Sequence, residues 1–125
     1  MNERNNRLDK ILATVAPEIA THWESCREAG LDAMTQENTD TVDAEIRAFF
    51  QRLKALPDPA TDDLVLAEMQ RLYQHLNAIN DKAGSDLLET DERELLVPVF
   101  IDAAFACGVD PEKYDGEPGG EYRDF

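Results

Sequence analysis

The 125-residue sequence is poor in basic residues. Lys and Arg total 12 against 27 for Asp and Glu, which gives a formal net charge of -15. This excess argues against a protein that binds nucleic acid through its phosphates, and against one that docks on anionic lipid, because both need clustered Lys and Arg. We therefore expect neither nucleic acid nor a membrane as a partner.

Long apolar runs and paired cysteines are also missing. The longest apolar run, 95–101, ends at Asp102 and is far shorter than the roughly 18 residues of a membrane span. The polar N-terminus lacks the character of a signal peptide. Cys26 and Cys107 show no CxxC spacing, so we expect two buried free thiols. These absences predict a soluble, cytoplasmic protein.

Apolar residues recur at spacings of three and four over three segments, which is the pattern of one helix face. The rows run over Leu8–Cys26, Val42–Leu56 and Val65–Ala83. Pro17 lies in the first row, so that helix either kinks or is divided there. The third row alternates four and three, as a helix seam does, and leaves a homodimer through this helix open.

Polar residues in front of these rows are candidate N-caps. Asp40 and Thr41 are candidates for the second helix, which makes 31–39 a connection, and Thr61 is the candidate for the third. Thr90 is the candidate for a last helix, which carries Pro98.

The last helix is apolar at nearly every position from Leu95 to Cys107, and such helices are usually buried. The sequence therefore predicts a single-domain, all-α bundle of four to five helices around this central C-terminal helix. The predicted helical domain covers 1–114. A Gly/Pro-containing, acidic and aromatic tail over 115–125 is expected to pack back on it.

Motifs for catalysis or metal binding are absent from the sequence. His22 and Cys26 lie one helical turn apart, but two ligands do not make a site, so we expect no metal or cofactor there. The acids between Glu89 and Glu94 are suited to general acid-base or Mg²⁺ chemistry, yet acids also collect at helix N-termini because they stabilise the helix dipole. We expect no catalytic residues.

Acidic charge is concentrated in residues 86–125, which hold twelve acids and three bases. Such a region either keeps the protein soluble or forms a face that steers onto a basic partner protein. The residues expected to contact such a partner are Asp91, Glu92, Glu94, Asp115, Glu117, Glu121 and Tyr122.

Two segments of the last forty residues carry a family resemblance. The stretch Leu-Glu-Thr-Asp-Glu-Arg-Glu at 88–94, running into Leu-Val-Pro, and the ending Gly-Glu-Tyr-Arg-Asp-Phe resemble small acidic bacterial helical proteins, mostly uncharacterised. Some of these look like toxin-immunity proteins. The resemblance implies an all-α cytoplasmic protein, without catalytic residues, that occludes the active surface of a toxin.

These observations lead to one hypothesis and two alternatives. We expect a non-enzymatic acidic binding protein, an immunity-type inhibitor of a basic toxin or nuclease domain. The alternatives are a carboxylate-based, metal-dependent enzyme and a homodimeric structural or regulatory protein.

Overall fold

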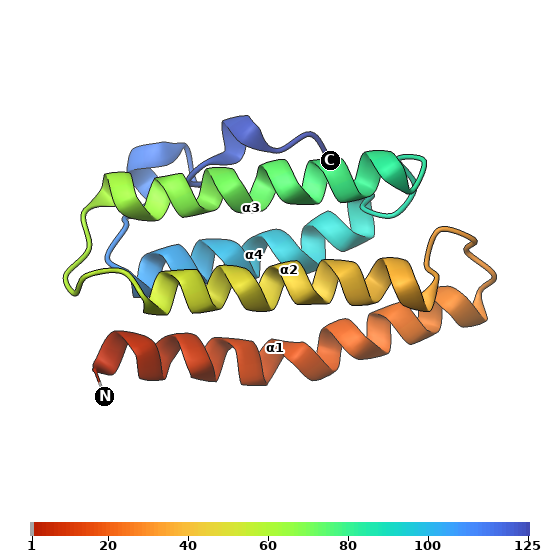
Figure 1. Ribbon diagram of the computed structural model, residues 1–125, viewed down its shortest axis with the longest axis horizontal. Coiled ribbons are helices and arrows are strands. Elements are labelled where there is room, and N and C mark those ends of the chain that lie inside the picture. Colours follow the sequence, from red (N-terminus) through yellow and green to blue (C-terminus); the bar gives the residue numbers. More distant parts are fainter. Residues whose placement is uncertain (1) are drawn as a thin grey trace.

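The computed structural model describes residues 2–125, which form four α-helices and two 3-10 turns (Figure 1). The elements are α1 (Glu3–Glu28), α2 (Gln36–Lys54), α3 (Asp62–Lys82), α4 (Thr90–Ala106), η1 (Pro111–Tyr114) and η2 (Gly120–Tyr122). The helices lie side by side, and no strand occurs in the described residues. The predicted all-α bundle is confirmed.

Both internal prolines lie inside continuous helices. α1 runs through Pro17 and bends near its middle (Figure 1), and α4 runs through Pro98. A proline removes one backbone hydrogen bond but does not end a helix whose apolar face is buried on both sides of it. In α1, Val15 and Ile19 flank Pro17 and are both buried. Neither proline therefore divides a helix.

α2 begins before the caps that the sequence suggested. Thr35 is the N-cap, and its hydroxyl accepts a hydrogen bond from the Asn38 amide at 3.1 Å. The prediction of Asp40 and Thr41 as caps is therefore wrong. The first turn of α2 is polar, with Gln36 and Glu37 exposed, Asn38 half-buried and Thr39 buried, so hydrophobic spacing gives no signal there.

The N-cap of α4 also lies one residue earlier than predicted. Glu89, not Thr90, is the N-cap, and Glu89 and Glu92 form a reciprocal capping box. The Glu92 side chain accepts a hydrogen bond from the Glu89 amide at 3.0 Å, which satisfies a backbone donor at the helix end. The first-turn acids of α4 thus include one with a defined structural contact.

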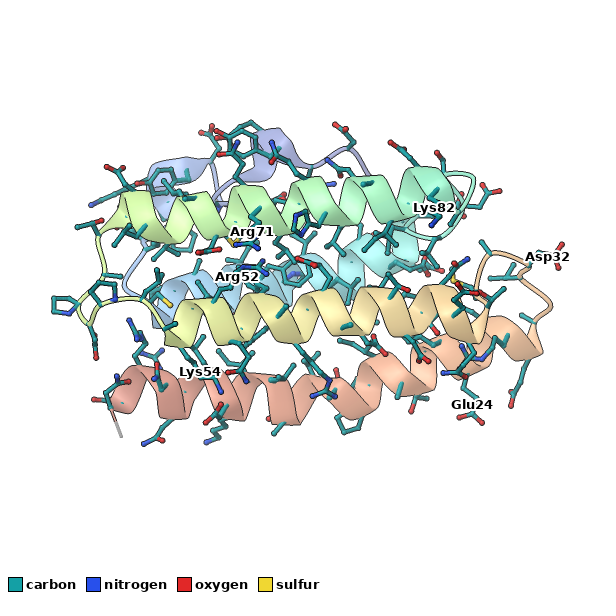
Figure 2. The ribbon with its side chains drawn as sticks, in the orientation of Figure 1. Glu24, Asp32, Arg52, Lys54, Arg71 and Lys82 are labelled. Carbon is teal, nitrogen blue, oxygen red and sulfur yellow. The ribbon has the colours of Figure 1, made fainter. Side chains whose placement is uncertain are left out.

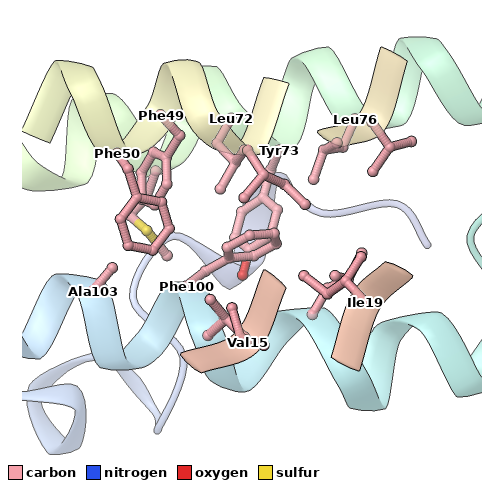
Figure 3. Packing of buried hydrophobic residues seen from close by; sticks show 14 of the residues in the cluster. Val15, Ile19, Phe49, Phe50, Leu72, Tyr73, Leu76, Phe100 and Ala103 are labelled. Atoms are coloured by element: carbon pink, nitrogen blue, oxygen red, sulfur yellow. The ribbon is translucent and has the colours of Figure 1, made fainter. Parts of the chain in front are cut away.

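Edge-on aromatic contacts connect three of the helices through the core (Figure 3). The Phe100 ring of α4 lies 5.9 Å from the rings of both Phe49 (α2) and Tyr73 (α3). Edge-to-face pairs of this kind add about 0.5–1.5 kcal/mol beyond the area that they bury. They fix the relative positions of α2, α3 and α4.

The apolar seam of α3 packs within the bundle, mainly against α2. Val65, Met69, Leu72 and Leu76 are completely buried in a single chain. The suggested homodimer through Val65–Ala83 would need these side chains at the surface. These four side chains are therefore occupied by contacts within one chain.

Residues after α4 lie along α3 (Figure 1). The Asn77 side chain donates to the Tyr122 carbonyl at 2.7 Å and accepts from the Asp124 amide at 2.9 Å. The Phe125 ring meets the Tyr73 ring at 6.1 Å. Polar and aromatic contacts thus hold this segment on α3.

Two of the scarce cations form ion pairs between helices. Arg52 of α2, drawn against α3 in Figure 2, donates to Glu68 at 2.8 Å and pairs with Glu45 at 3.3 Å. Lys54 of α2 contacts Asp9 of α1 at 2.7 Å. With 27 acids against 12 bases, the chain remains strongly acidic.

Candidate functional site

A groove of about 730 Å³ runs between α1 and α4. It is lined by Arg7, Lys10, Ile11, Thr14, Val15, Glu18, Glu94, Leu95, Pro98, Val99, Asp102 and Phe105. All of the α1 residues in this set lie on neighbouring turns of one helix face, and so do those of α4. The groove is therefore a direct product of how these two helices pair.

Apolar side chains form much of the groove lining. Phe105 is 55% exposed although it belongs to the most apolar helix. The Arg7 guanidinium lies 5.8 Å from the Phe105 ring centre, which is within cation-π range. The exposed ring adds apolar surface to one end of the groove.

Charged residues on the groove differ along its length. Arg7 lies where α1 meets Phe105, near the C-terminus of α4. Glu18 lies three turns further along α1, and Glu94 lies in the first turns of α4. Because α1 and α4 run antiparallel, one end of the groove carries Glu18 and Glu94, and the other carries Arg7, Lys10 and Asp102.

A polar cluster continues the acidic end of the groove. His22 follows Glu18 by one turn of α1, and its Nε2 lies 2.6 Å from Oε2 of Glu92 in α4. The same His22 Nε2 lies 3.5 Å from Sγ of Cys26. One ligand-type atom from each of these three residues lies within 4.8 Å of the other two.

The members of this cluster differ in their access to solvent. Glu92 and Cys26 are buried, whereas the His22 side chain keeps 24% of its surface exposed. Burial raises the pKa of the Cys26 thiol, and the negative charges of Glu92 and Asp91 raise it further. The thiol is therefore in its neutral form at pH 7 while only protein groups surround it.

The seven residues predicted to contact a partner occupy two elements, the first turns of α4 and the segment 115–122. Asp91, Glu94, Asp115 and Glu121 are exposed, and Glu117 and Tyr122 are half-buried. Glu94 also lines the groove.

The prediction that Glu92 contacts a partner does not agree with its position in the structure. Glu92 is only 4% exposed, and both of its carboxylate oxygens are engaged, one by His22 and one by the Glu89 amide. It cannot contact a partner without breaking its capping box.

The groove itself was missed by sequence reasoning, which placed the binding face on acidic residues alone. The available signal was α4, because a helix apolar on every side leaves one strip without a core to face. Phe105 lies on that strip. The location of the strip depends on the pairing of α1 with α4, which spacing patterns do not give.

Comparisons of the chain with protein-family models, curated proteins and solved structures found no match.

Within residues 2–125, none of the helices combines the length and apolar character needed to cross a bilayer.

Proposed function

We propose that the protein is a non-enzymatic binding protein that seats a basic, amphipathic segment of a partner protein in the α1–α4 groove. One observation carries this proposal: a groove of about 730 Å³ with exposed apolar lining and three carboxylates, on a chain of net charge -15. No step of the proposal requires a catalytic residue.

The dimensions of the groove match a short helix. Its α1 wall extends from Arg7 to Glu18, a length of about 17 Å at 1.5 Å per residue. About three turns of a partner helix fit along it, with apolar side chains against Leu95, Pro98 and Phe105. In this proposal α4 is the central element, since one side of it builds the core and the other binds.

Charge would select and orient the partner. The chain's net negative charge attracts a basic protein at long range and speeds their encounter. Glu18 and Glu94 would then pair with Lys or Arg side chains at one end of the groove, while Arg7 and Lys10, which outnumber Asp102 at the other end, would disfavour them there. A basic toxin or nuclease domain, occluded in the cytoplasm by an immunity-type inhibitor, is the partner class that we propose.

The test uses a fluorescently labelled, amphipathic basic peptide of about twelve residues, long enough to span the groove. We expect saturable binding that weakens as salt is added, because the charge pairs are exposed. The double variant Glu18→Lys/Glu94→Lys should weaken binding about tenfold or more, since it places like charges opposite the peptide.

The matched control is Asp115→Lys/Glu121→Lys, which makes the same change in net charge at exposed residues outside the groove. It should retain most of the affinity. A scrambled peptide with the same charge but no apolar face should bind weakly. Equal losses in the two double variants, or equal binding of the scrambled peptide, would show attraction to the overall charge and reject the groove.

A further inference from the structure

The cluster beyond the acidic end of the groove brings three different donor atoms to one point. Two come from adjacent turns of α1, His22 Nε2 and Cys26 Sγ, and the third from Glu92 of α4, seventy residues away from His22. All three atoms lie within 4.8 Å of one another. Nitrogen, sulfur and carboxylate oxygen together are ligands that Zn²⁺ commonly uses.

The spacing of the His22 and Cys26 donor atoms fits a small tetrahedral ion. With Zn–N near 2.0–2.1 Å and Zn–S near 2.3 Å, tetrahedral geometry separates N from S by about 3.5 Å. The observed His22–Cys26 separation is 3.5 Å. The His22–Glu92 separation of 2.6 Å is a hydrogen-bond distance, and it would widen by about 0.8 Å as an ion replaced the shared proton.

Burial of the Glu92 carboxylate also favours binding of a cation at this cluster. The Glu92 side chain is 5% exposed, and its ion-pair partner in the described residues is His22, which is charged only when protonated. An uncompensated buried carboxylate is costly. A divalent ion would supply positive charge at this point whether or not His22 carries a proton.

Neighbouring groups also orient the Glu92 carboxylate and leave the cluster accessible from solvent. The Glu89 amide fixes the second Glu92 oxygen, at 3.0 Å, and so orients the carboxylate. The partly exposed His22 side chain leaves access from solvent for a fourth ligand. The cysteine disfavours Mg²⁺ and Ca²⁺, which prefer oxygen ligands throughout.

We propose that His22, Cys26 and Glu92 form a Zn²⁺ site with three protein ligands and water in the fourth position. The bound ion joins α1 to α4. It is independent of the groove, so either proposal can fail without the other.

Co²⁺ added to the reduced, metal-free protein tests the site, because cobalt reports thiolate ligation through a sulfur-to-metal charge-transfer band. We expect this band, together with the visible absorption of tetrahedral cobalt, to saturate at one ion per chain. Zn²⁺ should then displace the cobalt and remove both signals. Absence of a charge-transfer band in the unmodified protein overturns the proposal.

Variants assign the ligands. Cys26→Ser should abolish the charge-transfer band, and Cys107→Ser, at the other buried free cysteine, should leave it unchanged. Glu92→Gln keeps a side chain that can complete the capping box, so the helix start is preserved while a charged ligand is lost. Because loss of a ligand's supporting partner alone costs about 10–100-fold in metal affinity, Glu92→Gln should cost at least about tenfold.

Circular dichroism of each variant checks that the helices remain. A band that survives Cys26→Ser, or one that is lost in Cys107→Ser, would place the ion elsewhere and overturn the assignment. Undiminished Zn²⁺ affinity in a folded Glu92→Gln variant would remove α4 from the site and overturn the proposed joining of the helices.

Discussion

At the scale of single residues, Tyr73 has a buried ring with a poorly satisfied hydroxyl. Its ring packs edge-on against Phe100 and Phe125. The hydroxyl is buried without a well-formed hydrogen bond, so nearby Glu117 acts on it chiefly as a negative charge. Burial and this charge raise the pKa of Tyr73 above its ordinary range. The ring therefore contributes packing energy, and the hydroxyl contributes little.

Removing only that hydroxyl should be tolerated. We expect Tyr73→Phe to leave the free energy of unfolding unchanged or to raise it by up to about 1 kcal/mol, because an unsatisfied buried polar group is lost. Tyr73→Ala should cost about 3–5 kcal/mol, since the ring is lost as well. Urea unfolding measures both. A loss of more than about 1 kcal/mol in Tyr73→Phe would mean that the hydroxyl has a strong partner.

Ionisation of Glu117 makes a contribution to the stability of the fold that depends on pH. Burial alone would raise the pKa of Glu117. Two hydrogen bonds that Arg123 donates to it, at 2.8 and 3.0 Å, together with the Arg123 charge, lower the pKa by more. The pKa of Glu117 therefore lies below its ordinary 4.5. A carboxyl with a lowered pKa in the fold stabilises the protein above the unfolded value of 4.5. This contribution is lost as pH falls through the lowered pKa.

Comparison with Glu117→Gln isolates the effect from the other 26 acids. The stability advantage of the unmodified protein over the variant should be constant above about pH 5 and should shrink toward lower pH. Denaturant unfolding over a pH series gives this difference. An advantage that stays constant or grows on acidification would contradict the assigned pKa direction.

The His22–Cys26–Glu92 cluster shows what residue spacing can and cannot predict. Positions 22 and 26 follow from helical periodicity, so their proximity was visible in the sequence. Glu92 joins them only because α1 and α4 pair antiparallel in one particular register. From the sequence, Glu92 was expected to be an exposed acid, because glutamates occur at helix N-termini both as capping residues and as exposed surface residues.

At the scale of elements, interiors of helices were predictable and some of their starts were not. The apolar rows of α1, α2 and α3 correspond to buried faces because burial itself sets the spacing. The start of α2 at Gln36 lies in a polar turn and depends on one hydroxyl, that of Thr35. A cap can be moved by several residues without disturbing the apolar row.

Gly119 determines how closely the C-terminal segment approaches α3. Its φ is +77°, and a Cβ added there would lie 2.9 Å from Cβ of Met69. Gly119→Ala should therefore lower the free energy of unfolding by about 2 kcal/mol or more, from backbone strain and a steric clash together.

Gly116 provides the matched control, because its φ is +84° and an added Cβ would meet nothing within 4 Å. Gly116→Ala should cost only the conformational part, about 1–2 kcal/mol. Urea unfolding with tryptophan fluorescence measures both variants. Equal losses would indicate that the segment does not pack closely on Met69.

At the scale of the whole molecule, the acid excess and the apolar helix α4 come together in the groove between α1 and α4. The sequence alone pointed to an acidic face on 86–125, but charge does not show where a partner is seated. In the bundle, an exposed apolar strip on α4 faces α1 and acquires acids from both helices, including Glu18, far from the acidic third. This combination arises only from the tertiary pairing.

The most direct test of the account is a map of backbone amide shifts in the isotope-labelled protein as the basic amphipathic peptide is added. We predict that the largest shifts fall on the facing residues of α1 and α4, from Arg7 to Glu18 and from Glu94 to Phe105. The segment 115–125, which holds four acids and one base, should shift little. Largest shifts on that segment, with the groove unchanged, would contradict the account.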